Sequence, residues 1–168
     1  VDLEQLPFEA RERQANLDMK INAGIPSITT LNTLAQAYEE AGIYLKQAET
    51  LATIYEMYPE SANLNNIGLA YSNAGKMAKA RDYYLMAYEK SKCSTVAFNL
   101  SRAYKYINNE EYERYLKESH ELDPKNPVIM VEMGDLYEGT NNQKSKEFYI
   151  QAYEILKKKL DSDNMMKW

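Results

Sequence analysis

The sequence predicts an all-α fold, an α-α superhelix built from antiparallel helical hairpins, on three observations. Tyr38, Tyr71, Tyr104 and Tyr137 follow one another at a constant step of 33 residues. Apolar and small residues keep fixed places before each tyrosine at the spacing of one helix face. Turn residues and prolines separate the repeated stretches. A repeat of this length indicates one supersecondary unit used several times in a row.

The first helix of each repeat ends at its tyrosine. Residues at equivalent positions of the four repeats are called a column. Three columns precede the tyrosine, at positions i, i+3 and i+4 when the tyrosine is at i+7, so all four lie on the same helix face. The columns are Leu31, Leu64, Ala97 and Met130; Leu34, Ile67, Leu100 and Met133; and Ala35, Gly68, Ser101 and Gly134. The last column holds small residues only, so a second helix is expected to approach closely there.

The second helix of each repeat shows a similar pattern, at i, i+4 and i+7. Its columns are Ala48, Ala80, Tyr112 and Ser145; Ala52, Tyr84, Leu116 and Tyr149; and Tyr55, Ala87, Ser119 and Ala152. Turn residues lie between the two helices at 41–42, 74–75, 108–109 and 141–142. Pro59 and Pro124 lie between repeats, where a helix must end. The unit is therefore helix–turn–helix.

These boundaries divide the chain into four repeats, at 28–60, 61–93, 94–126 and 127–160. Residues 1–27 are interpreted as an N-terminal half repeat or a capping helix, and residues 161–168 as a C-terminal tail. The tail is too short for a capping helix, although Met165, Met166 and Trp168 offer apolar groups that fold back. Without a cap, the last helix is left uncovered. A longer protein and a homodimer through this helix are both open as explanations.

Composition excludes several classes of function. The net charge of −5 disfavours nucleic acid as the main partner. No apolar run approaches the about 20 residues that span a bilayer, so no membrane association is expected. The single cysteine, Cys93, fits a reducing compartment and a cytoplasmic location. The first residue is Val1 and not Met, which leaves room for a preceding signal or domain.

No catalytic or metal-binding constellation is apparent. His120 is the only histidine, and no cysteine or second histidine stands near it. Cys93 has no histidine at a motif spacing and is interpreted as an inert thiol. The chain is therefore predicted not to be an enzyme and to hold no cofactor or metal.

The best repeat resembles the tetratricopeptide (TPR) family. It reads Asn-Ile-Gly-Leu-Ala-Tyr at 66–71, followed by Gly75, Ala80, Tyr84 and Ala87, and Glu-Leu-Asp-Pro at 121–124 is similar to the TPR repeat ending. The resemblance covers about residues 28–160. The family's aromatic residue early in the first helix is absent from all four repeats.

The TPR resemblance implies a groove on the first helices that binds a peptide or a segment of a partner protein. Carried over by column, the predicted peptide-binding residues are Asn32, Asn65, Asn66, Phe98, Asn99, Arg102, Lys105 and Asp135. Asn66 and Asn99 share a column and resemble asparagines that hold peptide backbones. Arg102 and Lys105 are suited to a carboxylate, and Phe98 to packing against a side chain.

One specific version of this function is not supported. The TPR clamp for chaperone C-termini needs Lys and Asn, then Asn, then Lys and Arg, and here Asn66 alone fits. The predicted function is a non-catalytic protein-interaction module. The alternative is a structural or oligomerisation module that docks through its uncapped terminal helix.

Overall fold

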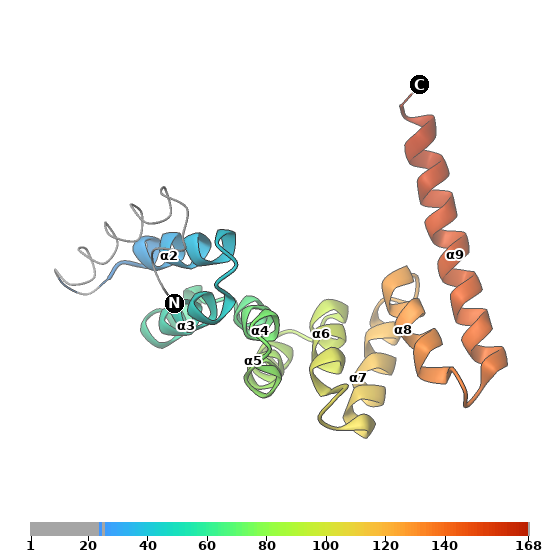
Figure 1. Ribbon diagram of the computed structural model, residues 1–168, viewed down its shortest axis with the longest axis horizontal. Helices are drawn as coiled ribbons and strands as arrows, with labels where there is room; N and C mark the ends of the chain where they lie inside the picture. Colours follow the sequence, from blue (N-terminus) through green and yellow to red (C-terminus); the bar gives the residue numbers. More distant parts are fainter. Residues whose placement is uncertain (1–23, 25, 168) are drawn as a thin grey trace. The chain divides into compact units, whose positions relative to one another are not determined.

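The computed structural model describes Gly24 and residues 26–167, so most of the half repeat expected at 1–27 lies outside the described residues. The chain divides after Ala87 into two compact units, called unit 1 and unit 2 below. The described residues contain helices and no strands (Figure 1), which confirms the predicted all-α fold.

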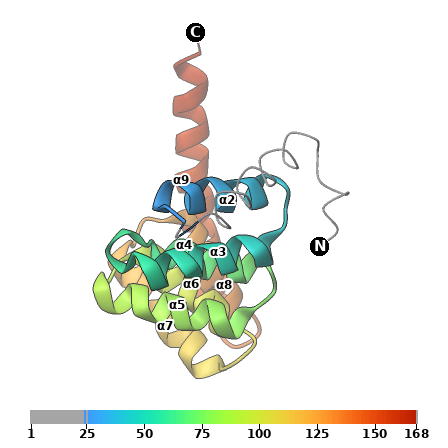
Figure 2. The ribbon, with the colours of Figure 1, turned by 90° about the vertical axis from the view of Figure 1, so that its left-hand side faces the viewer.

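Unit 1 contains α2 (Ile28–Glu40), α3 (Tyr44–Met57), the 3₁₀ helix η2 (Pro59–Ser61), α4 (Leu64–Asn73) and most of α5 (Met77–Lys90). Helix α3 packs against both α2 and α4, and α2 and α3 run side by side in Figure 2. The helix pairs α2–α3 and α4–α5 fall within the repeats predicted at 28–60 and 61–93.

Unit 2 contains α6 (Ser94–Tyr104), α7 (Asn109–Leu122), α8 (Pro127–Tyr137) and α9 (Asn142–Met165). Helix α6 packs on α7 and α8 packs on α9, while α7 also contacts α8. Its core includes Tyr112, Leu116, Ile129 and Met133, and Phe98 packs against this cluster from the side.

The hairpin turns close on the carbonyl group of the repeat tyrosine. In the first repeat, the N–H of Ile43 donates to the carbonyl of Tyr38 at 2.9 Å, and Gly42 adopts a φ of 71°. The second repeat has the same arrangement, with Lys76 donating to Tyr71 at 2.8 Å and Gly75 at a φ of 75°. This is a Schellman motif, which needs a residue without a Cβ at the left-handed position.

The other two turns are one residue tighter and depend on asparagine. Asn108 and Asn141 donate their backbone N–H groups to Tyr104 and Tyr137 at 2.9 and 2.8 Å. Their side chains then cap α7 and α9 by accepting from backbone N–H groups of the first turn. The sequence identifies all four sites as turns. Only the structure shows that glycine ends the first helix and asparagine begins the second.

A column of aromatic residues in the second helices was not recognised in the sequence. Tyr83, Tyr115 and Phe148 stack on the repeat tyrosines Tyr71, Tyr104 and Tyr137, with centroids 5.5, 5.7 and 6.0 Å apart. Leu51 occupies the same column in the first repeat. The steps of 32, 32 and 33 residues from Leu51 to Phe148 match those of the other second-helix columns and could have identified this one. It was missed because the residue changes from leucine in the first repeat to an aromatic residue in the other three.

The C-terminal end differs from the predicted tail at 161–168. Helix α9 continues to Met165 instead of ending near residue 160, because no glycine or proline interrupts it. Met165 and Met166 are highly exposed and do not fold back onto the helix. Figure 1 shows the C-terminal half of α9 extending beyond α8.

None of the helices in the described residues is both long and apolar enough to cross a bilayer.

Candidate binding groove

A hollow of about 380 Å³ lies in unit 1, among α2, α3 and α4. It is called the α2–α4 groove below. Its ten lining residues are Asn32, Ala35, Gln36, Glu39, Gln47, Leu51, Asn66, Leu69, Ala70 and Asn73. Two leucines and two alanines supply apolar surface, while amides make up most of the polar lining. Such a mixture is typical of sites that bind apolar stems and orient them with a few polar groups.

Side-chain caps fix the N-terminal ends of α2 and α4, the helices that form the two sides of the groove. Ser27 caps α2 by accepting from the N–H of Thr30 at 3.1 Å. Asn63 caps α4 by accepting from the N–H of Asn66 at 3.1 Å. The caps fix where each helix begins and therefore which residues face the groove. Asn32 and Asn66, both exposed, lie on its two sides.

Helix α2 contributes an acidic and acceptor-rich side. Gln36 donates its side-chain N–H to Glu40 at 3.0 Å, so that donor is engaged along its own helix. Glu39, one helical turn after Gln36, is exposed and is the only ionisable residue in the lining. No lysine, arginine or histidine contributes to the lining.

Helix α3 contributes a buried amide to the groove. Gln47 is only 8% exposed, and its Oε1 atom has no hydrogen-bond partner within the described residues. An unpaired buried carbonyl oxygen costs about 1–3 kcal/mol relative to a paired one. The sequence analysis missed Gln47, because its column holds charged residues in the other three repeats: Lys79, Glu111 and Lys144.

Unit 2 has a polar network that links three helices. Lys105, the residue directly after α6, donates to Glu132 on α8 at 2.6 Å, and the hydroxyl of Tyr112 on α7 donates to the same carboxylate oxygen at 2.9 Å. Burial alone would raise the pKa of Glu132, but these two hydrogen bonds lower it below its ordinary value of 4.5. Conversely, the bond to Glu132 raises the pKa of Lys105.

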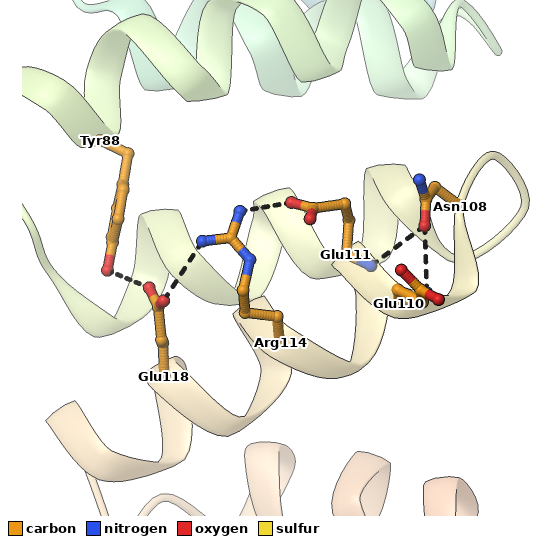
Figure 3. Close-up of polar contacts among 6 residues, drawn as sticks. All are labelled: Tyr88, Asn108, Glu110, Glu111, Arg114 and Glu118. Carbon is orange, nitrogen blue, oxygen red and sulfur yellow. Dashed lines mark hydrogen bonds and ion pairs between the residues drawn. The ribbon is translucent and has the colours of Figure 1, made fainter.

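A second network joins Tyr88, at the end of α5, to α7 (Figure 3). The hydroxyl of Tyr88 donates to Glu118 at 2.6 Å. Arg114 lies between Glu118 and Glu111 and forms ion pairs with both. Burial of the phenol, followed by its hydrogen bond to Glu118, raises the pKa of Tyr88 to about 12. The network therefore holds Tyr88 in place as a neutral donor.

Solved structures of similar fold identify the architecture. A MamA crystal structure superimposes with a TM-score of 0.74 at 18% identity, over 90% of this chain and 89% of that one. MamA from Desulfovibrio magneticus RS-1 gives a TM-score of 0.70 at 12% identity, over 91% and 98% of the two chains. BtubC from P. vanneervenii gives 0.62 at 16%, over 92% and 74%. MamA and BtubC contain TPR repeats.

The chain has the TPR fold. The sequence itself matches no protein-family model and no curated protein. At these identities the likeness concerns the fold, and the predicted resemblance to TPR repeats is confirmed at that level.

The predicted TPR groove residues divide between the two units. Asn32 and Asn66 both line the α2–α4 groove, whereas Asn65 is half-buried on α4 and lies outside the lining. Asn99 is half-buried on α6. The structure thus brings two of the four predicted asparagines together.

The charged and aromatic residues predicted in unit 2 already have partners in the chain. Arg102 lies over the ring of Phe98, 5.9 Å from its centroid. Asp135 accepts a hydrogen bond from the hydroxyl of Tyr149, and Lys105 is paired with Glu132. A ligand carboxylate would have to displace Glu132 to reach Lys105. Phe98 and Arg102 lie one turn apart on α6. Sequence spacing could not show the other two pairs, because their partners lie 14 and 27 residues away in the chain.

The two reactive side chains considered in the sequence both lie in unit 2. The ring of His120 packs edge to face on Phe148 at 5.3 Å, and Cys93 is a half-buried free thiol that precedes α6. No group of three His, Cys, Asp or Glu side chains in the part of the chain that the structure describes is arranged to hold a metal ion.

Replacing Glu132 by glutamine is expected to lower the stability of unit 2 by about 1–2 kcal/mol, since a partly buried charged acceptor is lost. Because the folded pKa of Glu132 is lowered, its contribution is present above pH 4.5 and is lost as the pH falls through the folded value. The parent should therefore lose stability more steeply on acidification than the variant. Urea denaturation across a pH series measures this difference.

The matched control is Glu138→Gln, an exposed glutamate directly after α8. It should leave both the stability and its pH dependence close to those of the parent. Identical acid profiles for the parent and Glu132→Gln would contradict the stabilising role of the network.

Proposed function

We propose that this chain is a non-catalytic protein-interaction module that binds an extended segment of a partner protein in the α2–α4 groove. The observation that carries the proposal is the position of Asn32 and Asn66 on the two sides of one hollow. Each amide offers both a donor and an acceptor, as a peptide backbone requires. The TPR fold supports the choice of a protein partner.

The groove suits a peptide strand better than a small metabolite. Its sides come from α2 and α4, and Leu51 and Leu69 supply its large apolar side chains. Leu69 is 43% exposed, so its side chain is accessible to a partner. Asn66 and Asn32 then fix the backbone while Leu69 contacts a side chain.

The residues predicted in unit 2 form a secondary contact set in this proposal. Asn99, in the column of Asn66, retains its predicted role toward a peptide backbone. Arg102, Phe98 and Asp135 serve side chains of the partner. Lys105 contributes only to a partner whose carboxylate replaces Glu132. Among the predicted residues of unit 1, Asn65 is the weakest candidate, because it lies outside the groove lining.

The direct test begins with selection of binders from a random peptide library displayed on phage, followed by synthesis of the selected peptide. Asn32→Ala and Asn66→Ala should each weaken its binding about fivefold, the equivalent of one hydrogen bond of about 1 kcal/mol. Titration calorimetry gives the affinities, and circular dichroism verifies that helicity is unchanged.

Asn164→Ala near the end of α9 is the matched control, an exposed asparagine remote in sequence from the groove. Its affinity should equal that of the parent. A library that yields no binder, or a peptide bound equally well by parent and both groove variants, would count against a peptide groove here.

The alternative function, docking through the terminal helix, rests on a different observation. Ile150, Tyr153, Leu156 and Leu160 are 45, 65, 49 and 61% exposed on one side of α9. Their spacing of three and four residues makes a continuous apolar stripe. In a second copy of the chain the same stripe would pack against it, giving the homodimer considered from the sequence.

A Tyr153→Lys, Leu160→Lys double variant tests the homodimer. The parent should sediment as a dimer at high concentration and the variant as a monomer, because two buried charges cannot pair in a symmetric contact. Gln151→Lys, exposed on the opposite side of α9, should leave the dimer intact. A parent that remains monomeric throughout the concentration series would eliminate this alternative.

A further inference from the structure

Gln47 points to what the α2–α4 groove binds. It is more than nine-tenths buried, it lines the hollow, and its carbonyl oxygen has no donor among the described residues. We propose that the groove takes a basic side chain, lysine or arginine, from the partner segment, with its N–H group donating to Gln47 and its charge beside Glu39. The proposal rests on the peptide-binding function and adds the chemistry of the bound side chain.

The charge of the lining selects a cation over an anion. Glu39 is the only charged residue among the ten, and no cation accompanies it. An acidic side chain would enter beside a carboxylate, whereas a basic one gains an ion pair. The ion pair with Glu39 by itself is expected to contribute little binding free energy, because Glu39 is exposed to solvent.

The hydrogen-bond chemistry points the same way. One side-chain N–H group of Gln36 donates to Glu40, while the oxygen of Gln47 has no donor among the described residues. Lysine and arginine carry donors and no acceptors. The methylene stem of such a side chain would pack against Leu51 and Leu69 and cover the apolar lining. Long basic side chains commonly bury their stems in this way while their charged ends reach polar groups.

Two of the other three repeats show what this column does when the chain supplies its own cation, whereas the third repeat holds Glu111 there. Lys79, which aligns with Gln47 in the second repeat, lies 5.3 Å from the centroid of the Tyr71 ring. Lys144, its equivalent in the fourth, lies 4.3 Å from that of Tyr137 and donates to its hydroxyl at 3.2 Å. In the first repeat the column holds a neutral, buried amide. The position is therefore open to a cation from outside the chain.

The size of the hollow matches a single side chain and the backbone around it. At about 380 Å³, the groove is at the lower end of the range of about 300–1,000 Å³ that small-molecule sites occupy. Blocked amino acids are therefore adequate probes. N-acetyl-lysine methylamide and N-acetyl-arginine methylamide carry the proposed group, and the norleucine and glutamate derivatives are the matched controls.

The experiment is a titration of the ¹⁵N-labelled full chain with each probe, followed by amide shifts of Gln47, Asn32 and Asn66. The lysine or arginine probe should move these signals in a saturable manner, at least about tenfold more tightly than norleucine or glutamate. Equal responses to lysine and norleucine would overturn the proposal, as would stronger binding of glutamate.

Three variants locate the interaction. Gln47→Leu removes the acceptor and should weaken the basic probe about tenfold. Gln47→Lys supplies the cation from within the chain, as Lys79 does, and should abolish binding of the basic probe. Glu39→Gln changes an exposed residue, so folding is not at risk, and should weaken binding about threefold. Unaltered affinity in all three would overturn the proposal.

Failure of this proposal is distinguishable from failure of the peptide-binding function. If the phage-selected peptide binds and depends on Asn66, but contains no basic residue and the basic probes leave Gln47 unmoved, the groove binds peptides without a basic anchor. If no library peptide binds and no probe shifts the groove signals, both proposals fail together.

Discussion

Leu116→Ala is expected to lower the free energy of unfolding of unit 2 by about 3 kcal/mol. Leu116 is fully buried on α7 and packs in a cluster with Tyr112, Ile129 and Met133. Truncation removes the transfer free energy of the side chain and leaves a cavity that helices from two hairpins would have to close. Because helices in repeat folds are stabilised mainly by their neighbours, the contact between α7 and α8 should weaken most.

Chemical denaturation followed by circular dichroism measures the loss, and hydrogen exchange locates it. Amides of α7 and α8 should lose protection in the variant, because local opening requires less free energy there. Leu122→Ala on the same helix is the matched control. Leu122 is 48% exposed, so its truncation should cost less than about 1 kcal/mol. Equal losses for the two variants would contradict the assigned core.

Gly68→Ala is expected to destabilise unit 1 by about 2 kcal/mol. A Cβ atom at Gly68 would lie 2.6 Å from two ring carbons of Tyr84, which is only 2% exposed and has no space to move into. Overpacking of this kind costs about 3 kcal/mol at its upper end. The higher helix propensity of alanine recovers about 1 kcal/mol. Thermal and urea denaturation of the variant test the net loss.

Gly134→Ala is the control within the same column. Its Cβ would lie 2.5 Å from the ring of Tyr149. That ring is only half-buried, so it can swing outward at the expense of its hydrogen bond to Asp135. The gain in helix propensity offsets much of this cost, and the net change should stay within about 1 kcal/mol. A larger loss at Gly134 than at Gly68 would show that burial of the facing tyrosine is not the deciding factor.

The repeat pattern of the sequence predicted the elements and their faces. Leu34, Ile67, Leu100 and Met133, one column of the 33-residue repeat, are all buried. The turns were predicted equally well. Glycine allows the left-handed backbone conformation of a helix end and asparagine caps the next helix with its side chain, and both effects reach only a few residues along the chain. These features are local, and local spacing along a helix determines them.

The lining of the α2–α4 groove was predictable only in part. The TPR resemblance, carried over by column, implied that Asn32 and Asn66 face a groove, and both line this hollow. Gln47 was not predicted, because it belongs to a second helix and its column is charged elsewhere. Its importance depends on an absent donor, and an absent donor becomes visible only when neighbouring helices are in place.

The sequence by itself determined the helical hairpins, their order, the faces that pack and the turns that join them, because each follows from residues close together in the chain. Tertiary structure alone decided which polar groups are satisfied. From its sequence position Lys105 was expected to be available to a ligand, but in the fold it is paired with Glu132 of α8. Packing around Gln47, in contrast, left its oxygen without a donor among the described residues. The physical reason is that pairing across helices depends on distances between segments remote in sequence, which periodicity does not encode.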